Sequence, residues 1–139
     1  MKKFFIFTIA VLSVTYIFAQ SGLEVSREAN GTKILKGFIP KSVLTTDTAF
    51  NWYAQNAKGY TPATEAVQQF TAARDSVNLI IFGGTWCGDT KHLLPQFFTT
   101  TDAAGFPENR ITLIGVDRSK KTLYNLSEAF NITNVPTFI

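Results

Sequence analysis

Two runs rich in apolar residues and of strand length lie in the second half of the chain, at 78–84 and 110–117. They consist of "NLIIFGG" and "RITLIGVD". The first is continuous and does not alternate between apolar and polar residues, which predicts a strand buried on both faces, as in a parallel sheet, and we expect the second to be a buried strand too. Between the runs, apolar residues at helical spacing predict a helix, and Pro95 inside it implies a kink. The apolar positions of this helix are Leu93, Leu94, Phe97 and Phe98.

The earlier part of the chain contains a strand pattern followed by a helical one. The segment "GTKILKGFI" at 31–39 has strand composition and ends at Pro40, so we expect the first strand there. A helical pattern follows and ends near Gly59, with Thr46 and Asp47 as capping residues. Its spacing is carried by Phe50, Tyr53 and Ala57.

A further helix is expected directly before the first apolar run. Thr61 can cap its free amides, and Pro62 suits the first helical position, where its missing N–H costs nothing. One face of this helix would carry Ala63, Val67, Phe70 and Val77. With a helix around "LYNLSEAF" and a short strand in "NVPTFI", the order of elements predicts an α/β fold. Its central sheet contains a parallel strand pair flanked by helices.

Length and composition agree with one globular domain. The chain has 139 residues, of which 45% are hydrophobic and 17% charged. This length suits a single domain, and the composition is that of a chain that buries a core.

The first residues have the composition of a secretory signal peptide. Two lysines precede an apolar run from Phe4 to Phe18, and Ala19 provides a cleavage position, so we expect residues 1–19 to be removed. The alternative is an uncleaved anchor helix, but the run is shorter than the roughly 20 residues that cross a bilayer. We therefore expect an extracytoplasmic protein, periplasmic or secreted, without a stable membrane anchor after cleavage.

Charge gives no support to nucleic-acid binding. Without Lys2 and Lys3, 11 basic residues face 10 acidic ones, and the net charge falls from +3 to +1. The largest remaining basic cluster, "DRSKK" at 117–121, is short and lacks interleaved aromatic residues. We interpret it as a solvated loop.

Cys87 is the only cysteine of the chain, and this restricts its chemistry. An internal disulfide is impossible, so the thiol is free, buried or joined to another molecule. One cysteine and one histidine do not make a zinc site, and we expect neither a metal nor another cofactor. His92 lies five residues along the expected helix and therefore on a different face from Cys87, which argues against a hydrolase pair.

The segment "WCGDTK" at 86–91 lies at a strand-to-helix junction, and Pro136 of "NVPTFI" follows Cys87 by 49 residues. Together the two motifs resemble the thioredoxin-like superfamily, whose signature is W-C-G-P-C-K with a cis-proline loop of the form V/I-P-T. The resemblance covers 61–139 and implies a thioredoxin-like domain there, after an N-terminal strand and helix extension at 20–60.

A domain of that family continues past the cis-proline strand into a hairpin partner strand and a final helix, whereas this sequence ends at Ile139. We expect either a fragment or a shortened domain that another chain completes. The fragment is favoured, because an unpaired apolar strand edge is prone to aggregation.

The resemblance implies that Cys87 is a nucleophile at a helix N-terminus, where free amides and the macrodipole favour a thiolate. Thr90 replaces the second cysteine, and its hydroxyl can stabilise the sulfur but cannot resolve a mixed disulfide. Asp89 stands where the family has proline and adds a negative charge that opposes thiolate formation, whereas the positive charge of Lys91 acts in the opposite direction, so the two residues leave the net effect open. Ile81 occupies the position of the acidic residue that moves protons in thioredoxins. An external thiol must therefore resolve any adduct.

By the same resemblance, Val135 and Pro136 form one wall of a peptide-binding groove and Trp86 forms another. The expected function is thiol-disulfide exchange by a monothiol route. Its partners would be a protein or peptide that contains a disulfide or a thiol, and an external thiol reductant. The alternative is a redox-inactive module that uses the same groove to bind peptides or a protein partner.

Overall fold

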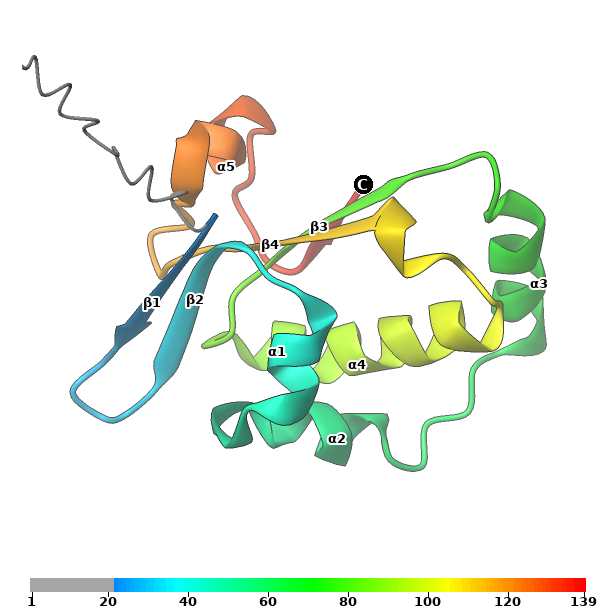
Figure 1. The fold of residues 1–139 in the computed structure, drawn as a ribbon, viewed down its shortest axis with the longest axis horizontal. Coiled ribbons are helices and arrows are strands. Elements are labelled where there is room, and N and C mark those ends of the chain that lie inside the picture. The colour runs from blue at the N-terminus through cyan, green and yellow to red at the C-terminus, as the bar shows by residue number, and fades with distance from the viewer. Residues whose placement is uncertain (1–21) are drawn as a thin grey trace, which may run out of the picture.

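A computed structural model describes residues 22–139, so the expected signal peptide lies outside the described residues. The described chain is a mixed α/β structure around a five-stranded sheet with the order β1-β2-β4-β3-β5. Helices α1, α2 and α4 lie on one side of this sheet and α5 on the other (Figure 1). No helix among the described residues is long and apolar enough to span a membrane.

The two apolar runs form the parallel pair in the sheet, as predicted. Strand β3 covers Leu79–Gly83 and β4 covers Ile111–Gly115, and their register pairs Ile81 with Leu113. The side chains of Ile81 and Phe82 are completely buried on opposite faces of the sheet, since they belong to different core clusters. Burial on both faces explains why the runs do not alternate.

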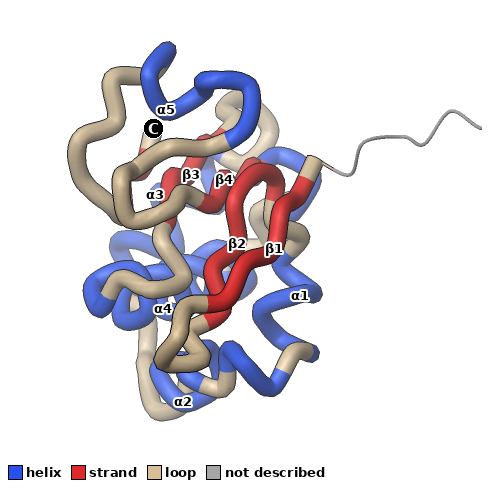
Figure 2. Tube along the Cα trace, turned by 90° about the vertical axis from the view of Figure 1, so that its left-hand side faces the viewer, coloured by secondary structure: helices blue, strands red, loops and turns tan. Residues whose placement is uncertain are grey.

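The N-terminal region forms an antiparallel hairpin, and here the sequence prediction was incomplete. The strand expected at 31–39 is β2, Lys33–Phe38. It is the second strand and not the first, because β1 at Leu23–Arg27 precedes it and pairs with it. Four of the five β1 residues are exposed at the sheet edge, which leaves no apolar pattern to predict this strand. The hairpin lies beside β4 (Figure 2), where Gly37 pairs with Gly115.

The helical pattern after β2 divides into three short elements instead of one helix. They are α1 at Lys41–Thr46, a single 3₁₀ turn at Thr48–Phe50 and α2 at Trp52–Ala57. Asp47 is a cap, as predicted, because its side chain accepts a hydrogen bond of 2.9 Å from the Ala49 amide. It caps the 3₁₀ turn.

The predicted start of the next helix was wrong. Helix α3 covers Thr64–Ala73, and its N-cap is Ala63, whose methyl side chain cannot accept a hydrogen bond from the helix amides. Ala63 has an extended backbone, so Thr61 and Pro62 precede the helix. Phe70 attaches α3 to the rest of the protein through edge-to-face contacts with Phe97 and Phe106, at centroid distances of 5.7 and 5.8 Å.

Helix α4, Gly88–Ala103, is the longest element and continues through Pro95 as one helix. With α1 and α2 it covers the main core. This core combines the sheet and the helices, so its members between 35 and 53 belong to the same packed unit as those between 81 and 113. Its buried members are Leu35, Ile39, Leu44, Phe50, Tyr53, Ile81, Leu94, Phe98 and Leu113.

A smaller core lies on the opposite face and contains Phe82, Ile114 and Val116. It is covered by the segment after β4, which includes a 3₁₀ turn at Leu123–Asn125, α5 at Leu126–Ala129 and β5 at Thr137–Phe138. Strand β5 pairs antiparallel with β3.

Two adjacent leucines of α4 provide a matched test of this packing. Leu94 is 2% exposed in the core, whereas Leu93 is 43% exposed. We expect Leu94→Ala to lower the free energy of unfolding by about 2–5 kcal/mol, because it leaves a cavity against the sheet. Leu93→Ala should change it by less than about 0.5 kcal/mol. Urea unfolding followed by circular dichroism checks both, and equal losses would contradict the packing described.

Candidate functional site

The site is centred on Cys87, which lies between the end of β3 and the start of α4. A tight turn brings the Cys87 amide to the Gly84 carbonyl at 2.8 Å, and the Cys87 carbonyl accepts the first helical hydrogen bond from Lys91 at 3.0 Å. Cys87 is therefore the N-cap of α4. Its thiol is free and half-buried.

The Cys87 sulfur contacts the segment before β5. Its thiol donates a hydrogen bond of 3.3 Å to the carbonyl of Val135, 48 residues further along the chain. The peptide bond between Val135 and Pro136 is cis. Because β5 pairs with β3 through Phe82 and Thr137, the sheet itself holds this segment beside the cysteine turn. The structure therefore brings together Cys87, Val135 and Pro136.

Thr90 lies under the turn and is 1% exposed. Its hydroxyl oxygen accepts a hydrogen bond of 3.2 Å from the Gly84 amide, and its methyl group packs beneath Gly83. Among the described residues no hydrogen bond joins this hydroxyl to the Cys87 sulfur. The bond to Gly84 uses an acceptor position, so the hydroxyl proton is still available for donation.

Thr85 connects the turn to the N-terminal hairpin, and the sequence interpretation missed this residue. Its buried hydroxyl donates to the Lys33 carbonyl at 2.9 Å and accepts from the Leu35 amide at 3.2 Å. One side chain thus supplies both partners that a neighbouring strand would supply to β2. No spacing or motif could have identified it, because its partners are backbone atoms about fifty residues earlier.

Trp86 is held in place on three sides. Its indole N–H donates to the Val116 carbonyl at 3.0 Å, and its ring lies against Gly84, where a Cβ would be 2.8 Å from the indole. The guanidinium of Arg118 lies 5.0 Å from the ring centroid, a cation–π contact. The Trp86 side chain therefore has a defined orientation beside Cys87.

Arg118 is in turn bound by Glu28, which follows β1. The pair has two parallel hydrogen bonds, one of them 2.8 Å long, between the guanidinium and the carboxylate. The hydrogen bond from Arg118 holds the pKa of Glu28 below its usual value. The N-terminal hairpin, for which the sequence suggested no role in function, thus supports both Thr85 and Trp86.

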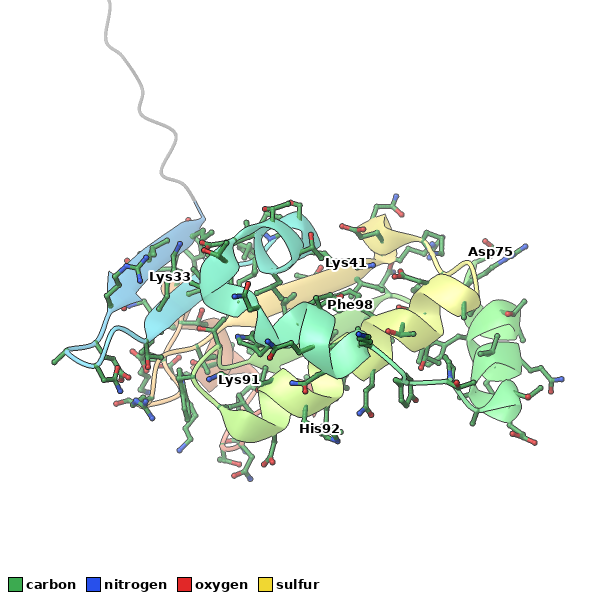
Figure 3. All side chains as sticks on the ribbon, turned by 90° about the horizontal axis from the view of Figure 1, so that it is seen from below. Lys33, Lys41, Asp75, Lys91, His92 and Phe98 are labelled. Atoms are coloured by element: carbon green, nitrogen blue, oxygen red, sulfur yellow. The ribbon has the colours of Figure 1, made fainter. Side chains whose placement is uncertain are left out.

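The other expected residues lie on the first turns of α4. Asp89 is exposed and Lys91 is half-buried, with its carbonyl bonded to the Asn56 amide group at 2.9 Å. His92 is exposed and lies 3.3 Å from Gln96, one turn further along α4 (Figure 3). The His92 ring contacts Gln96 and not Cys87, so no cysteine-histidine pair forms among the described residues.

The segment that carries Val135 is anchored by α5. Glu128 accepts hydrogen bonds from Lys121 at 2.6 Å and from Ser127 at 2.9 Å. Ile132 and Val135 then pack against the smaller core under β3 and β4. The two hydrogen bonds, from Lys121 first and then Ser127, lower the pKa of Glu128 from 4.5 to about 2.

Residues 22–139 contain no group of three histidine, cysteine or carboxylate side chains that could hold a metal ion. No family model matches the chain, and neither the curated proteins nor the solved structures contain a match to it. The geometry of the site is therefore the basis for assigning a function.

The role of Thr85 is tested by removing only its hydroxyl. Thr85→Val keeps the shape but leaves the Leu35 amide and the Lys33 carbonyl without these partners. We expect it to destabilise the fold by about 1–3 kcal/mol in urea unfolding. Thr85→Ser keeps the hydroxyl and is the control. Faster amide hydrogen exchange at Leu35 in the valine variant alone would locate the effect, whereas unchanged exchange would show that the bond is dispensable.

Glu128 predicts a pH dependence of stability. Because its folded pKa of about 2 lies below the ordinary 4.5, the ionised carboxylate stabilises the fold above pH 4.5. This contribution is lost as the pH falls through about 2. The melting temperature of Glu128→Gln should therefore lie below that of the wild type near neutrality, and the two should converge in acid.

Glu65→Gln is the control for this experiment, since Glu65 is exposed on α3 and its side chain makes no ion pair within residues 22–139. A gap between wild type and Glu128→Gln that stays constant down to pH 2 would contradict the ion pair.

Proposed function

We propose that this chain is an exported thioredoxin-like protein that carries out thiol-disulfide exchange by a monothiol route at Cys87. The single observation that carries the proposal is the contact between the Cys87 sulfur, at the N-terminus of α4, and the Val135 carbonyl beside the cis peptide bond. This contact joins the two motifs on which the thioredoxin-like resemblance depends. It also brings the free thiol and an extended backbone segment to one place.

The reaction begins with attack of the Cys87 thiolate on one sulfur of a substrate disulfide. A bond forms between the two sulfurs, and the second substrate sulfur leaves with the electron pair and takes up a proton. Cys87 is oxidised in the mixed disulfide, and the released thiol is reduced. An external thiol then attacks the mixed disulfide, which regenerates Cys87 and leaves the reductant joined to the substrate.

Two features of the site support the first step. The free amides at the start of α4 favour negative charge on the sulfur. Apart from its neighbours in the chain, nothing lies within 4 Å of the position that a Gly88 Cβ would take, so this side of the cysteine turn is open. Ile81 is completely buried where thioredoxins carry an acid, so this strand supplies no proton-transfer group.

Substrate binding is assigned to the walls on either side of the sulfur. The segment at 135–136 offers backbone groups for strand addition by an extended peptide, and the fixed indole of Trp86 offers an apolar surface. A protein or peptide with an accessible disulfide suits this arrangement. An extracytoplasmic location, where such disulfides persist, fits the same proposal.

A second function is a redox-inactive module that binds peptides through the same walls. The observation that favours it is the hydrogen bond from Cys87 to Val135, because a serine hydroxyl would make the same bond. Under this function, Cys87→Ser keeps partner binding intact. Under the exchange function, it abolishes the covalent adduct.

The proposal predicts a faster reaction of Cys87 in the folded protein than in the unfolded chain. Incubation with oxidised glutathione should give a single adduct by intact mass, released by dithiothreitol. We expect it to form about tenfold faster without urea than with it. Thr90→Val should lose much of this difference and Thr90→Ser should keep it, because the hydroxyl accepts a hydrogen bond from the Gly84 amide and so holds the turn that presents Cys87.

Cys87→Ser is the control for adduct position. Equal rates in the folded and unfolded chains would contradict the exchange function and leave the binding module as the better assignment.

A further inference from the structure

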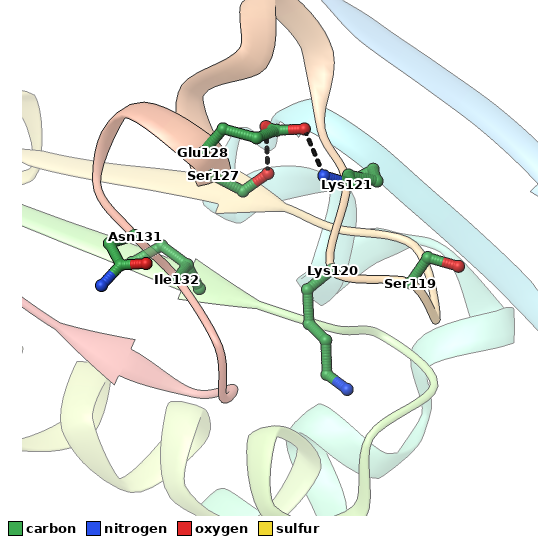
Figure 4. Close-up of a pocket in the computed structure, with 7 residues that line it drawn as sticks. All are labelled: Ser119, Lys120, Lys121, Ser127, Glu128, Asn131 and Ile132. Carbon is green, nitrogen blue, oxygen red and sulfur yellow. Dashed lines mark hydrogen bonds and ion pairs between the residues drawn. The ribbon is translucent and has the colours of Figure 1, made fainter.

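A polar cavity of about 160 Å³ lies between the turn after β4 and the end of α5. Figure 4 shows its two sides, with Ser119 and Lys120 on the turn and Asn131 and Ile132 on the segment that follows α5. The cavity lies outside the cysteine turn, and none of its residues has a role in the exchange step described above. Its volume suits a group of a few atoms, such as a carboxylate or a phosphate.

The charges around the cavity leave one positive charge unbalanced. The Lys121 ammonium is bound to Glu128, whose carboxylate is also bound by Ser127. Lys120 is half-buried and takes part in no ion pair among the described residues. Glu128 is neutralised by its partner, so the net charge of the lining is that of Lys120.

The turn that presents Lys120 is held by Asp117. One Asp117 carboxylate oxygen accepts hydrogen bonds of 2.9 Å from the Ser119 and Lys121 amides. Lys120 has a left-handed backbone conformation with φ 58°, and Asn131 opposite it has φ 51°. Residues other than glycine seldom adopt this conformation, so the surrounding contacts hold both backbones in it.

The cavity is adjacent to the cysteine site along the chain. Ile132 lines the cavity and lies three residues before Val135, so the two are separated by at most about 11 Å. Both side chains pack against the same small core. The Ile132 side of the cavity therefore lies within about 11 Å of the segment that contacts Cys87.

We propose that this cavity is a subsite for an anionic group of the disulfide substrate, with the Lys120 ammonium as its charge partner and the Asn131 amide as a hydrogen-bond donor. The inference rests on the proposed exchange function, since it assigns the substrate class of the same site. The substrate is then a disulfide peptide or protein with a carboxylate near the reacting sulfur.

The test compares two small disulfides that differ in charge. Dithiobis(nitrobenzoate) carries a carboxylate on each ring, whereas dithiodipyridine is neutral, and both release a coloured thiol on reaction with Cys87. The quantity measured, at low ionic strength, is the rate with dithiobis(nitrobenzoate) divided by the rate with dithiodipyridine. We expect Lys120→Gln to lower this ratio about fivefold, an effect that salt should reduce.

Lys58→Gln is the matched control, because Lys58 is exposed at the end of α2 and makes no ion pair in the described structure. Lys58→Gln lowers the net charge of the protein by the same amount as Lys120→Gln but leaves the cavity intact. Its rate ratio should therefore remain near that of the wild type. Circular dichroism confirms that both variants fold. An equal decrease in both variants would mean that only the overall charge matters and would overturn the subsite.

The remaining outcomes separate the two proposals. If the neutral reagent does not react with folded protein, the exchange function fails and the substrate subsite fails with it. If it reacts but the ratio is unchanged in Lys120→Gln, the exchange function stands and the subsite alone is overturned. Inorganic phosphate is the probe for a free anion. If it changes the NMR chemical shifts of the Asn131 side chain while the rate ratio is the same in Lys120→Gln and the wild type, the cavity binds a free anion and the substrate subsite is overturned.

Discussion

The hydroxyl of Thr85 holds the cysteine turn against the sheet, and the arrangement of the site depends on it. Strand β2 pairs with β4 only through Gly37 and Phe38, near the end of β2. Earlier in β2, the Thr85 hydroxyl replaces a neighbouring strand by bonding to the Leu35 amide and the Lys33 carbonyl. Since a buried backbone group without a partner is costly, these two bonds fix where the turn can lie. The position of Cys87 follows from that of Thr85, two residues earlier.

The two sides of the cysteine site are built by distant parts of the chain. On one side, Trp86 is held by the carbonyl of Val116 and by Arg118, which the N-terminal hairpin binds through Glu28. On the other side, Val135 is held by β5 and by the small core. Cys87 joins the two sides through its hydrogen bond to Val135. The surroundings of the sulfur are therefore set by tertiary structure, although the motif around it is local.

The sequence was sufficient for the central parallel strands, because a strand buried on both faces has a continuous apolar run. It was insufficient for β1, whose exposed edge position leaves no apolar pattern, and for the start of α3, where the predicted cap at Thr61 lies before the helix. The motif alone led to the prediction that Cys87 is a functional residue, which stays a prediction. Thr85 had no such signal, because a side chain that bonds to backbone atoms leaves no trace in spacing or composition.

The hydrogen bond from Cys87 to Val135 can be measured directly, because the chain has a single cysteine and hence a single S–H stretching band in the infrared. Donation to a carbonyl weakens the S–H bond. The account predicts that the band of the folded protein lies at a lower frequency than that of the urea-unfolded chain, and that Cys87→Ser removes it. A folded-state band at or above the unfolded frequency would show that the thiol does not contact the Val135 carbonyl, and would contradict the site on which the proposed function is based.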